Sequence, residues 1–183
     1  MKMNKKTRNL AISGVLAALG VVILYIGSLI EIMDLTAVFV ASFLVVIAIL
    51  ELKAPWHFLL WVVTSLLSLL LLPNKFCAFE YAIFGGLYPI LKYYYEKYSR
   101  KMANILKIIS FNVLFFVAVV VFIFLFGLGE IELPILGTVT PTAYVAAMAV
   151  LANIVFVLYD ILLTRFIIIY EHKYRKRMKR IFK

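Results

Sequence analysis

Long apolar runs separated by short polar breaks dominate this chain. Apolar side chains fill six runs, at residues 10–30, 35–50, 56–72, 76–94, 105–128 and 142–169. About 20 apolar residues in a helix cross the roughly 30 Å of hydrocarbon in a bilayer. The runs are too long for membrane strands and lack their alternation of period two. The pattern predicts an all-α fold: an integral membrane bundle of six transmembrane helices that forms a single domain.

Composition supports a membrane protein. The chain has 183 residues, of which 66% are hydrophobic and 15% are charged, whereas soluble chains are about half apolar and a quarter charged. The run 10–30 is longer than the apolar core of a signal peptide, which has about 7–15 residues, so we expect it to be retained as the first helix. The run 76–94 is the most interrupted, because it contains Glu80, Gly85, Gly86 and Pro89.

The basic residues predict the orientation of the helices. With six spans, 18 of the 19 basic residues fall on one side and Lys75 falls on the other. Basic residues concentrate in cytoplasmic loops, so the N and C termini are expected in the cytoplasm of a cell-membrane protein. We expect the basic tail at 170–183 to lie along the headgroups. The net charge of +10 is explained by attraction to anionic lipids of the inner leaflet, with no nucleic-acid partner.

The sequence contains no recognisable motif for catalysis or metal binding. The sequence has no Ser-His-Asp set, no HExxH and no phosphate loop of the P-loop type. Cys77 is a single cysteine, and His57 and His172 are far apart. We therefore expect no catalytic residue, no metal site and no cofactor, and energy for any transport would come from a partner or an ion gradient.

Polar residues near the outer ends of the spans are candidates for solute binding, because polar groups in a bilayer are costly. Asn74 and Lys75 follow Pro73 in a turn, and Glu80 and Tyr81 lie about one helical turn beyond it. Glu80 and Lys75 either pair with each other or meet the charged ends of a solute that enters from outside.

Polar residues of the last two spans allow two interpretations. Asn112 and Asn153 lie near mid-span, where they either join the two helices by hydrogen bonds or line the floor of a pocket. Tyr144 lies at the start of the last span. Asp160 lies five residues before Arg165, and an acid at this depth indicates either an internal ion pair or a link to a cytoplasmic partner. The connection 127–141, rich in Gly and Pro, is either a cover over a pocket or a packed connector.

Small residues cluster at the cytoplasmic end of the first span. Ser13 and Ala17 are four residues apart, as are Gly14 and Ala18, and Ala11 lies beside them. Such small-xxx-small pairs let another helix approach closely. The stripe is interpreted either as internal packing or as a docking surface for a partner helix.

These features together resemble the substrate-binding S component of an energy-coupling factor (ECF) transporter. That family has a similar size, six spans, both termini inside, and a small-residue stripe on its first helix, which the stretch 10–20 (LAISGVLAALG) matches with Ser13 and Gly14 in place of alanine. The resemblance implies capture of a vitamin, precursor or metal ion at the external face. It also implies a transmembrane coupling subunit, docked on the stripe, and two cytoplasmic ATPases of the ABC type. The candidates for substrate contact, chosen by depth and polarity, are Asn74, Lys75, Glu80, Tyr81, Asn112, Tyr144 and Asn153.

Two other functions are compatible with the sequence. A scaffold such as the cell-shape membrane protein of the MreD type has a similar size and span count and would bind no ligand. A membrane enzyme or lipid carrier would use Glu80 or Asp160 on a lipid. An S component should contain a closed, polar-lined cavity under the external loops, whereas a scaffold should be packed there.

Overall fold

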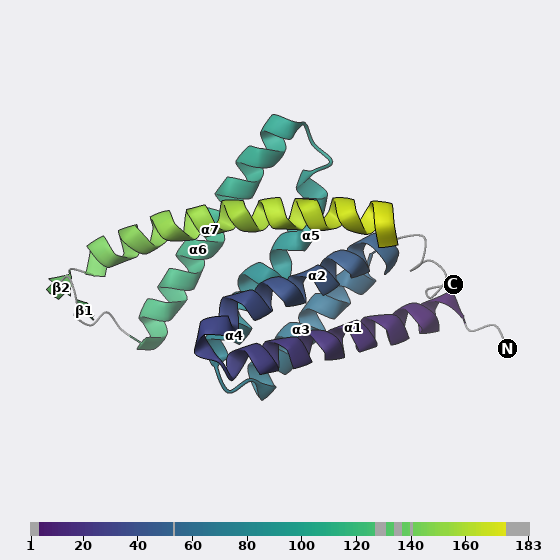
Figure 1. Cartoon of the computed structure of the whole chain (residues 1–183), viewed down its shortest axis with the longest axis horizontal. Helices are drawn as coiled ribbons and strands as arrows, with labels where there is room; N and C mark the ends of the chain where they lie inside the picture. The colour runs from purple at the N-terminus through teal and green to yellow at the C-terminus, as the bar shows by residue number, and fades with distance from the viewer. Residues whose placement is uncertain (1–3, 53, 127–130, 134–136, 140, 175–183) are drawn as a thin grey trace.

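The computed structural model describes residues 4–52, 54–126, 131–133, 137–139 and 141–174. The long elements are all helices (Figure 1). They are α1 (Lys5–Ser28), α2 (Asp34–Leu52), α3 (Trp56–Leu71), α4 (Lys75–Glu80), α5 (Leu87–Tyr95), α6 (Arg100–Phe126) and α7 (Pro141–Ile169). Shorter elements are the 3-10 turn η1 (Glu31–Met33), the π-helical turns η2 (Tyr81–Gly85) and η3 (Tyr170–Tyr174), and the strands β1 (Ile131–Leu133) and β2 (Gly137–Val139).

Each predicted apolar run is helical over most of its described residues, which confirms the helical class. Four stretches are long and apolar enough to cross a membrane: α1, α2, Arg100–Val121 in α6, and Ala143–Tyr174 across α7 and η3. Helix α3 has 16 residues and is therefore about 24 Å long. The run 76–94 is divided into α4, η2 and α5. Six crossings and cytoplasmic termini stay predictions.

Local side-chain hydrogen bonds determine where α3 ends and α4 begins. The side chain of Asn74 caps α4 by accepting a hydrogen bond of 3.0 Å from the backbone N–H of Phe76. The ammonium group of Lys75 donates to the carbonyl oxygens of Leu69 and Leu72, each at 2.8 Å. Because the last carbonyls of a helix lack internal partners, this lysine stabilises the end of α3.

The first four runs form a tightly packed bundle. A continuous core extends through α1, α2, α3 and the α4–η2–α5 segment, with Leu24, Val45 and Leu60 almost fully buried. Glycines bring the helices close: an added Cβ at Gly27 would overlap Ala37, and one at Gly86 would overlap the Trp61 ring. Helices α6 and α7 pack against this dense region, through α5 and α2 respectively.

Helices α6 and α7 lie outside this bundle. In Figure 1, α7 runs along one side of the molecule and α6 crosses it at a steep angle. Within the apolar windows of α6 and α7 only 11% of residues are buried, compared with 39% in α1 and 50% in α2. Their exposed faces are apolar, as expected for surfaces in contact with lipid.

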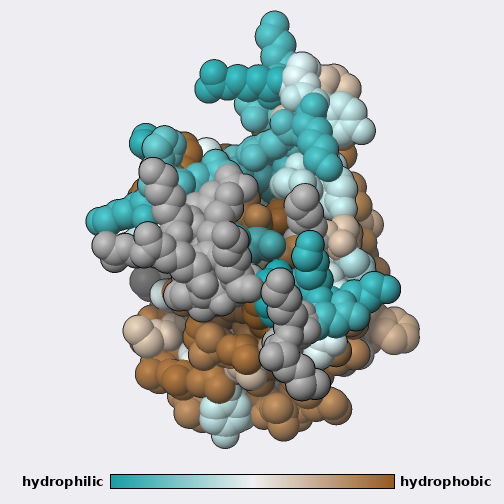
Figure 2. Space-filling view, turned by 90° about the vertical axis from the view of Figure 1, so that its right-hand side faces the viewer, coloured by the Kyte–Doolittle hydropathy of each residue, from teal (hydrophilic) through white to brown (hydrophobic). Residues whose placement is uncertain are grey.

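Hydrophilic side chains cover much of the end of the molecule at which α1 begins (Figure 2). Helix α1 begins and η3 ends at the same end in Figure 1, and Figure 2 shows hydrophilic side chains over the upper and middle parts of that end, above an apolar region. Lys5, Lys97, Arg100, Lys101 and Arg165 are all exposed.

The connection between α6 and α7 contains a short hairpin. Strands β1 and β2 pair antiparallel, with Ile131 opposite Val139. Residues 127–130, 134–136 and 140 lie outside the described part of the chain, so the predicted cover over a pocket is not tested. Residues 175–183, most of the predicted basic tail, also lie outside it.

Candidate functional site

A cavity of about 320 Å³ lies between the bundle and the two outer helices. Its volume falls at the lower end of the range for small-molecule sites, about 300–1,000 Å³. Helices α2, α4, α5, α6 and α7 and the turn η2 all contribute to it. The lining consists of Leu35, Val38, Phe39, Glu80, Phe84, Tyr88, Phe111, Phe115, Met148, Leu151, Ala152, Val155, Phe156 and Tyr159.

Helical spacing explains why these side chains share one space. Glu80, Phe84 and Tyr88 follow one another at intervals of four residues, so they lie on one face of the α4–η2–α5 segment. On α2, Leu35, Val38 and Phe39 are spaced by three and four residues, which also places them on one helical face. The α7 residues between 148 and 159 follow the same helical spacing. The cavity is therefore the meeting place of four helical faces.

The π-helical turn η2 lies within the segment that carries Glu80, Phe84 and Tyr88. In this turn the backbone N–H of Gly86 donates to the carbonyl of Tyr81 at 2.7 Å, a five-residue step. The indole Nε1 of Trp61 donates to the carbonyl of Ala82 at 3.0 Å and so holds the turn against α3. Single π turns within helices occur frequently at functional sites.

Glu80 gives the cavity its acidic group. One carboxylate oxygen, Oε2, is buried and has no hydrogen-bond partner among the described residues. A buried carboxylate is costly unless it is paired or hydrogen-bonded. The cavity thus contains an acceptor whose partner can come from a bound molecule.

The rest of the lining is largely apolar and half of it is aromatic. Ring pairs stack across the helices: Phe111 with Phe156 at 4.2 Å between centroids, and Phe39 with Tyr159 at 4.4 Å. The expected polar lining is thus reduced to Glu80 and two tyrosines, of which Tyr88 has its hydroxyl engaged with Asp160. The reason is that the facing surfaces of α6 and α7 carry Phe, Val and Leu.

An ion cluster of two buried lysines, a partly buried aspartate and an exposed glutamate lies next to the cavity, where Tyr88 contacts Asp160. Lys92 is 1% exposed and forms ion pairs with Asp160 and, at 3.0 Å, with Glu96. Lys107 forms ion pairs with the same two acids, at 3.0 Å to Glu96 and 3.4 Å to Asp160. Two positive and two negative groups balance, which is the condition under which charges are tolerated in a bilayer.

The ion cluster confirms the internal ion pair predicted for Asp160. Its partners come from α5 and α6, whereas Arg165 is exposed. The hydroxyl of Thr164 accepts a hydrogen bond of 2.8 Å from Lys92. Lys92 and Lys107 lie within the apolar runs 76–94 and 105–128, and that position was the available signal in the sequence for buried partners.

The structure separates the predicted substrate-binding residues. Of these, Glu80 lines the cavity. Asn74 hydrogen-bonds the Asp34 carboxylate and caps α4, and Lys75 is held by carbonyls of α3. Tyr81 is 1% exposed within the core of the bundle. Tyr144 is half-buried in the first turn of α7.

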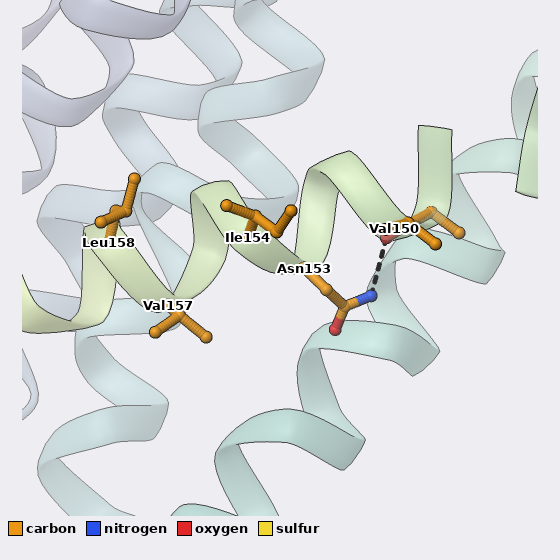
Figure 3. A pocket seen from close by; sticks show the side chains of 6 residues that line it. Val150, Asn153, Ile154, Val157 and Leu158 are labelled. Atoms are coloured by element: carbon orange, nitrogen blue, oxygen red, sulfur yellow. Dashed lines mark hydrogen bonds between the residues drawn. The ribbon is translucent and has the colours of Figure 1, made fainter. Parts of the chain in front are cut away.

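Asn112 and Asn153 join α6 to α7 through two reciprocal amide hydrogen bonds of 3.0 and 3.1 Å. This confirms the interhelical alternative. Asn153 also borders a shallow depression formed by α7 residues alone, where it donates 2.8 Å to the carbonyl of Ala149 (Figure 3). The side chains drawn there come from one helix, so we regard the depression as lipid-facing surface.

The small-residue stripe of α1 divides between two faces. Ser13 and Ala17 are buried against the bundle, and the Ser13 hydroxyl donates to the carbonyl of Asn9 at 2.8 Å. Ala11, Gly14 and Ala18 are exposed, and a Cβ added at Gly14 would meet nothing within 4 Å. One side of the stripe therefore packs inside the bundle, and the other side of α1 is open.

The aromatic residues of the cavity were missed by sequence reasoning. Phe84, Tyr88, Phe111 and Phe156 look like ordinary apolar bulk in the sequence, and the spacing of Glu80, Phe84 and Tyr88 was the one available signal. Among the described residues, no group of three or more His, Cys, Asp or Glu side chains could hold a metal ion.

Comparisons of the chain with protein-family models, curated proteins and solved structures found no match. What the cavity binds therefore has to be inferred from its lining.

Proposed function

We propose that this chain is a membrane-embedded subunit that captures a small solute, as the substrate-binding component of an ECF-type importer. Its partners would be a transmembrane coupling subunit and two ABC ATPases. The observation that carries the proposal is the cavity of about 320 Å³ with the Glu80 carboxylate in its wall. A pocket with few polar groups among apolar side chains is typical of small-molecule sites.

The location of the cavity supports capture from outside. Leu35 is the second residue of α2 and Glu80 is the last residue of α4. The charge pattern predicts that the start of α2 and the turn before α4 lie at the external face. A solute from that side would reach Glu80 after about one helical turn.

The alternatives explain less of the structure. A scaffold without a ligand has no need of a cavity with a buried, unpartnered carboxylate oxygen, because such a group lowers stability. A lipid-modifying enzyme would have to use Glu80 without Asp160, because Asp160 is engaged by two lysines. A lipid carrier fits the apolar lining, and the first experiment below distinguishes it by the mass of the bound molecule.

Native mass spectrometry of the purified protein tests capture directly. We expect a retained small polar-headed molecule in the wild type and its loss in Glu80→Ala. Asn74→Ala should also reduce uptake, because it removes the N-terminal cap of α4, the helix that carries Glu80. Glu51→Gln, at the far end of α2, is the matched control for removing an acidic charge. A lipid as the retained mass, or undiminished binding and uptake in Glu80→Ala, would contradict the proposal.

The exposed part of the α1 stripe, Ala11, Gly14 and Ala18, is the proposed docking surface for the coupling subunit. Gly14→Leu or Ala18→Leu should abolish co-purification of that subunit and the ATPases from native membranes. Because both positions are exposed, the variants should fold normally. Leu66→Phe, an exposed change on α3, is the control. Association that survives both stripe variants would remove α1 as the docking surface.

A further inference from the structure

We infer that the cavity selects an organic cation: a molecule with a flat apolar body and a positively charged nitrogen that donates an N–H to Glu80. This inference rests on the proposed capture function and specifies the ligand class for the same cavity. It is derived from three features of the site, namely the acceptor, the surrounding charges and the aromatic walls.

The acceptor requires a donor. Oε2 of Glu80 is buried without a hydrogen-bond partner among the described residues. A carboxylate accepts hydrogen bonds and donates none when it is ionised. A charged N–H donor forms a shorter and stronger bond with it than a neutral donor does. An anionic ligand would instead add a second negative charge beside the first.

The cationic side chains near the cavity are already occupied. Lys75, five residues before Glu80, is bound by the carbonyls of Leu69 and Leu72. Lys92 and Lys107 are balanced by Glu96 and Asp160. Lys75 keeps its charge but forms no ion pair with Glu80 in the described part of the chain, and the other two lysines are balanced by acids. The positive partner of Glu80 is therefore left to the ligand.

A second acid lies at the same end of the cavity. Asp34 immediately precedes the lining residue Leu35, and its carboxylate accepts a hydrogen bond from the amide of Asn74. An amide donor holds the carboxylate in place without cancelling its charge. The two acids give this end of the cavity a negative potential, which attracts a cation and repels an anion.

The aromatic walls suit the remaining part of such a ligand. Phe84 follows Glu80 by four residues on the same helical face, so a cation bound at Glu80 lies beside an aromatic ring. Aromatic faces attract cations, by about 0.5–2 kcal/mol depending on solvation. The stacked pairs Phe111–Phe156 and Phe39–Tyr159 offer flat surfaces for a flat apolar body.

A set of matched probes tests this inference. Naphthylethylamine, naphthylethanol and naphthylacetate share a ring system and are cationic, neutral and anionic. Binding of each to the full chain in nanodiscs is measured by calorimetry, with empty nanodiscs as background. We expect the amine to bind at least tenfold more tightly than the alcohol, which is about 1.4 kcal/mol, and the acetate to bind more weakly than both.

Variants locate the selectivity. Glu80→Gln keeps the shape of the side chain and should remove the preference, so that the amine and the alcohol bind about equally. Glu51→Gln should keep the wild-type preference. Thermal unfolding checks that both variants fold, and Glu80→Asp, which retains the charge, should retain part of the preference. Equal binding of amine and alcohol to the wild type, absence of binding of all three probes, or an undiminished preference in Glu80→Gln would overturn the inference.

The experiments distinguish an error about the cation from an error about solute capture as such. A retained neutral or anionic solute in native mass spectrometry would refute the cation and leave capture intact. Retention of no solute, together with no coupling partner, would refute capture itself.

Discussion

The hydroxyl of Tyr88 donates a hydrogen bond of 2.7 Å to Oδ1 of Asp160. The Tyr88 ring lines the cavity, while Asp160 is the acid shared by Lys92 and Lys107. This one bond therefore connects the cavity to the charged contact between α5, α6 and α7. A ligand that moves the Tyr88 ring would change the position of Asp160 and, with it, the packing of the two outer helices.

Tyr88→Phe should weaken this connection without changing the shape of the cavity. The substitution removes one donor to a charged acceptor, so we expect the free energy of unfolding to fall by about 1–3 kcal/mol. Unfolding in mixed detergent micelles measures the change. Tyr93→Phe, on an exposed ring of the same helix, should change stability by less than about 0.5 kcal/mol. Equal stability of the two variants would show that the bond is energetically unimportant.

Lys92→Met should be among the most destabilising single changes in the chain. It leaves the partly buried Asp160 and the exposed Glu96 with a single lysine. Breaking a fully buried ion pair costs about 3–5 kcal/mol, and the exposure of Glu96 places the expected cost at the lower end of that range. The double variant Lys92→Met/Asp160→Leu should recover most of the loss, because the Lys107–Glu96 pair remains balanced. Lys101→Met, on an exposed side chain, is the control. A double variant no more stable than Lys92→Met would refute charge balance as the cause.

Gly86→Ala should destabilise the bundle because the new methyl group meets the Trp61 ring. Overpacking of this kind costs about 1–3 kcal/mol. Gly14→Ala is the opposite case, since its Cβ enters open space and alanine favours a helix over glycine by up to about 1 kcal/mol. Thermal unfolding of the two variants should therefore shift in opposite directions, and shifts of the same sign would contradict the packing described for α3 and η2.

The Asn112–Asn153 pair should contribute modestly to the contact of α6 with α7. A double-mutant cycle with Asn112→Ala and Asn153→Ala should give a coupling energy near 0.6 kcal/mol and at most about 1.7 kcal/mol, as for other hydrogen bonds between membrane helices. The cycle is measured by unfolding of the two single variants and the double variant. A coupling energy of zero would indicate that the two helices are held together by packing alone.

The helices themselves could be predicted from the sequence. Predicted runs 35–50 and 56–72 correspond closely to α2 (Asp34–Leu52) and α3 (Trp56–Leu71). The physical reason is that backbone groups in a bilayer must be satisfied within the segment, so a long apolar run has few alternatives to a helix. Glu80 was found for a related reason: an acid inside an apolar run is costly and requires an explanation.

Only the tertiary structure decided which faces of the helices meet. The pairing of Lys92 with Asp160 joins residues 68 positions apart, and the cavity needs the faces of α2, α6 and α7 to converge on Glu80. An apolar run shows that a side chain is in the membrane and leaves open whether it touches lipid or another helix, because both environments are apolar. Asn74 and Lys75 illustrate this limit, since their polarity was visible in the sequence and their engagement with α2, α3 and α4 depends on the fold.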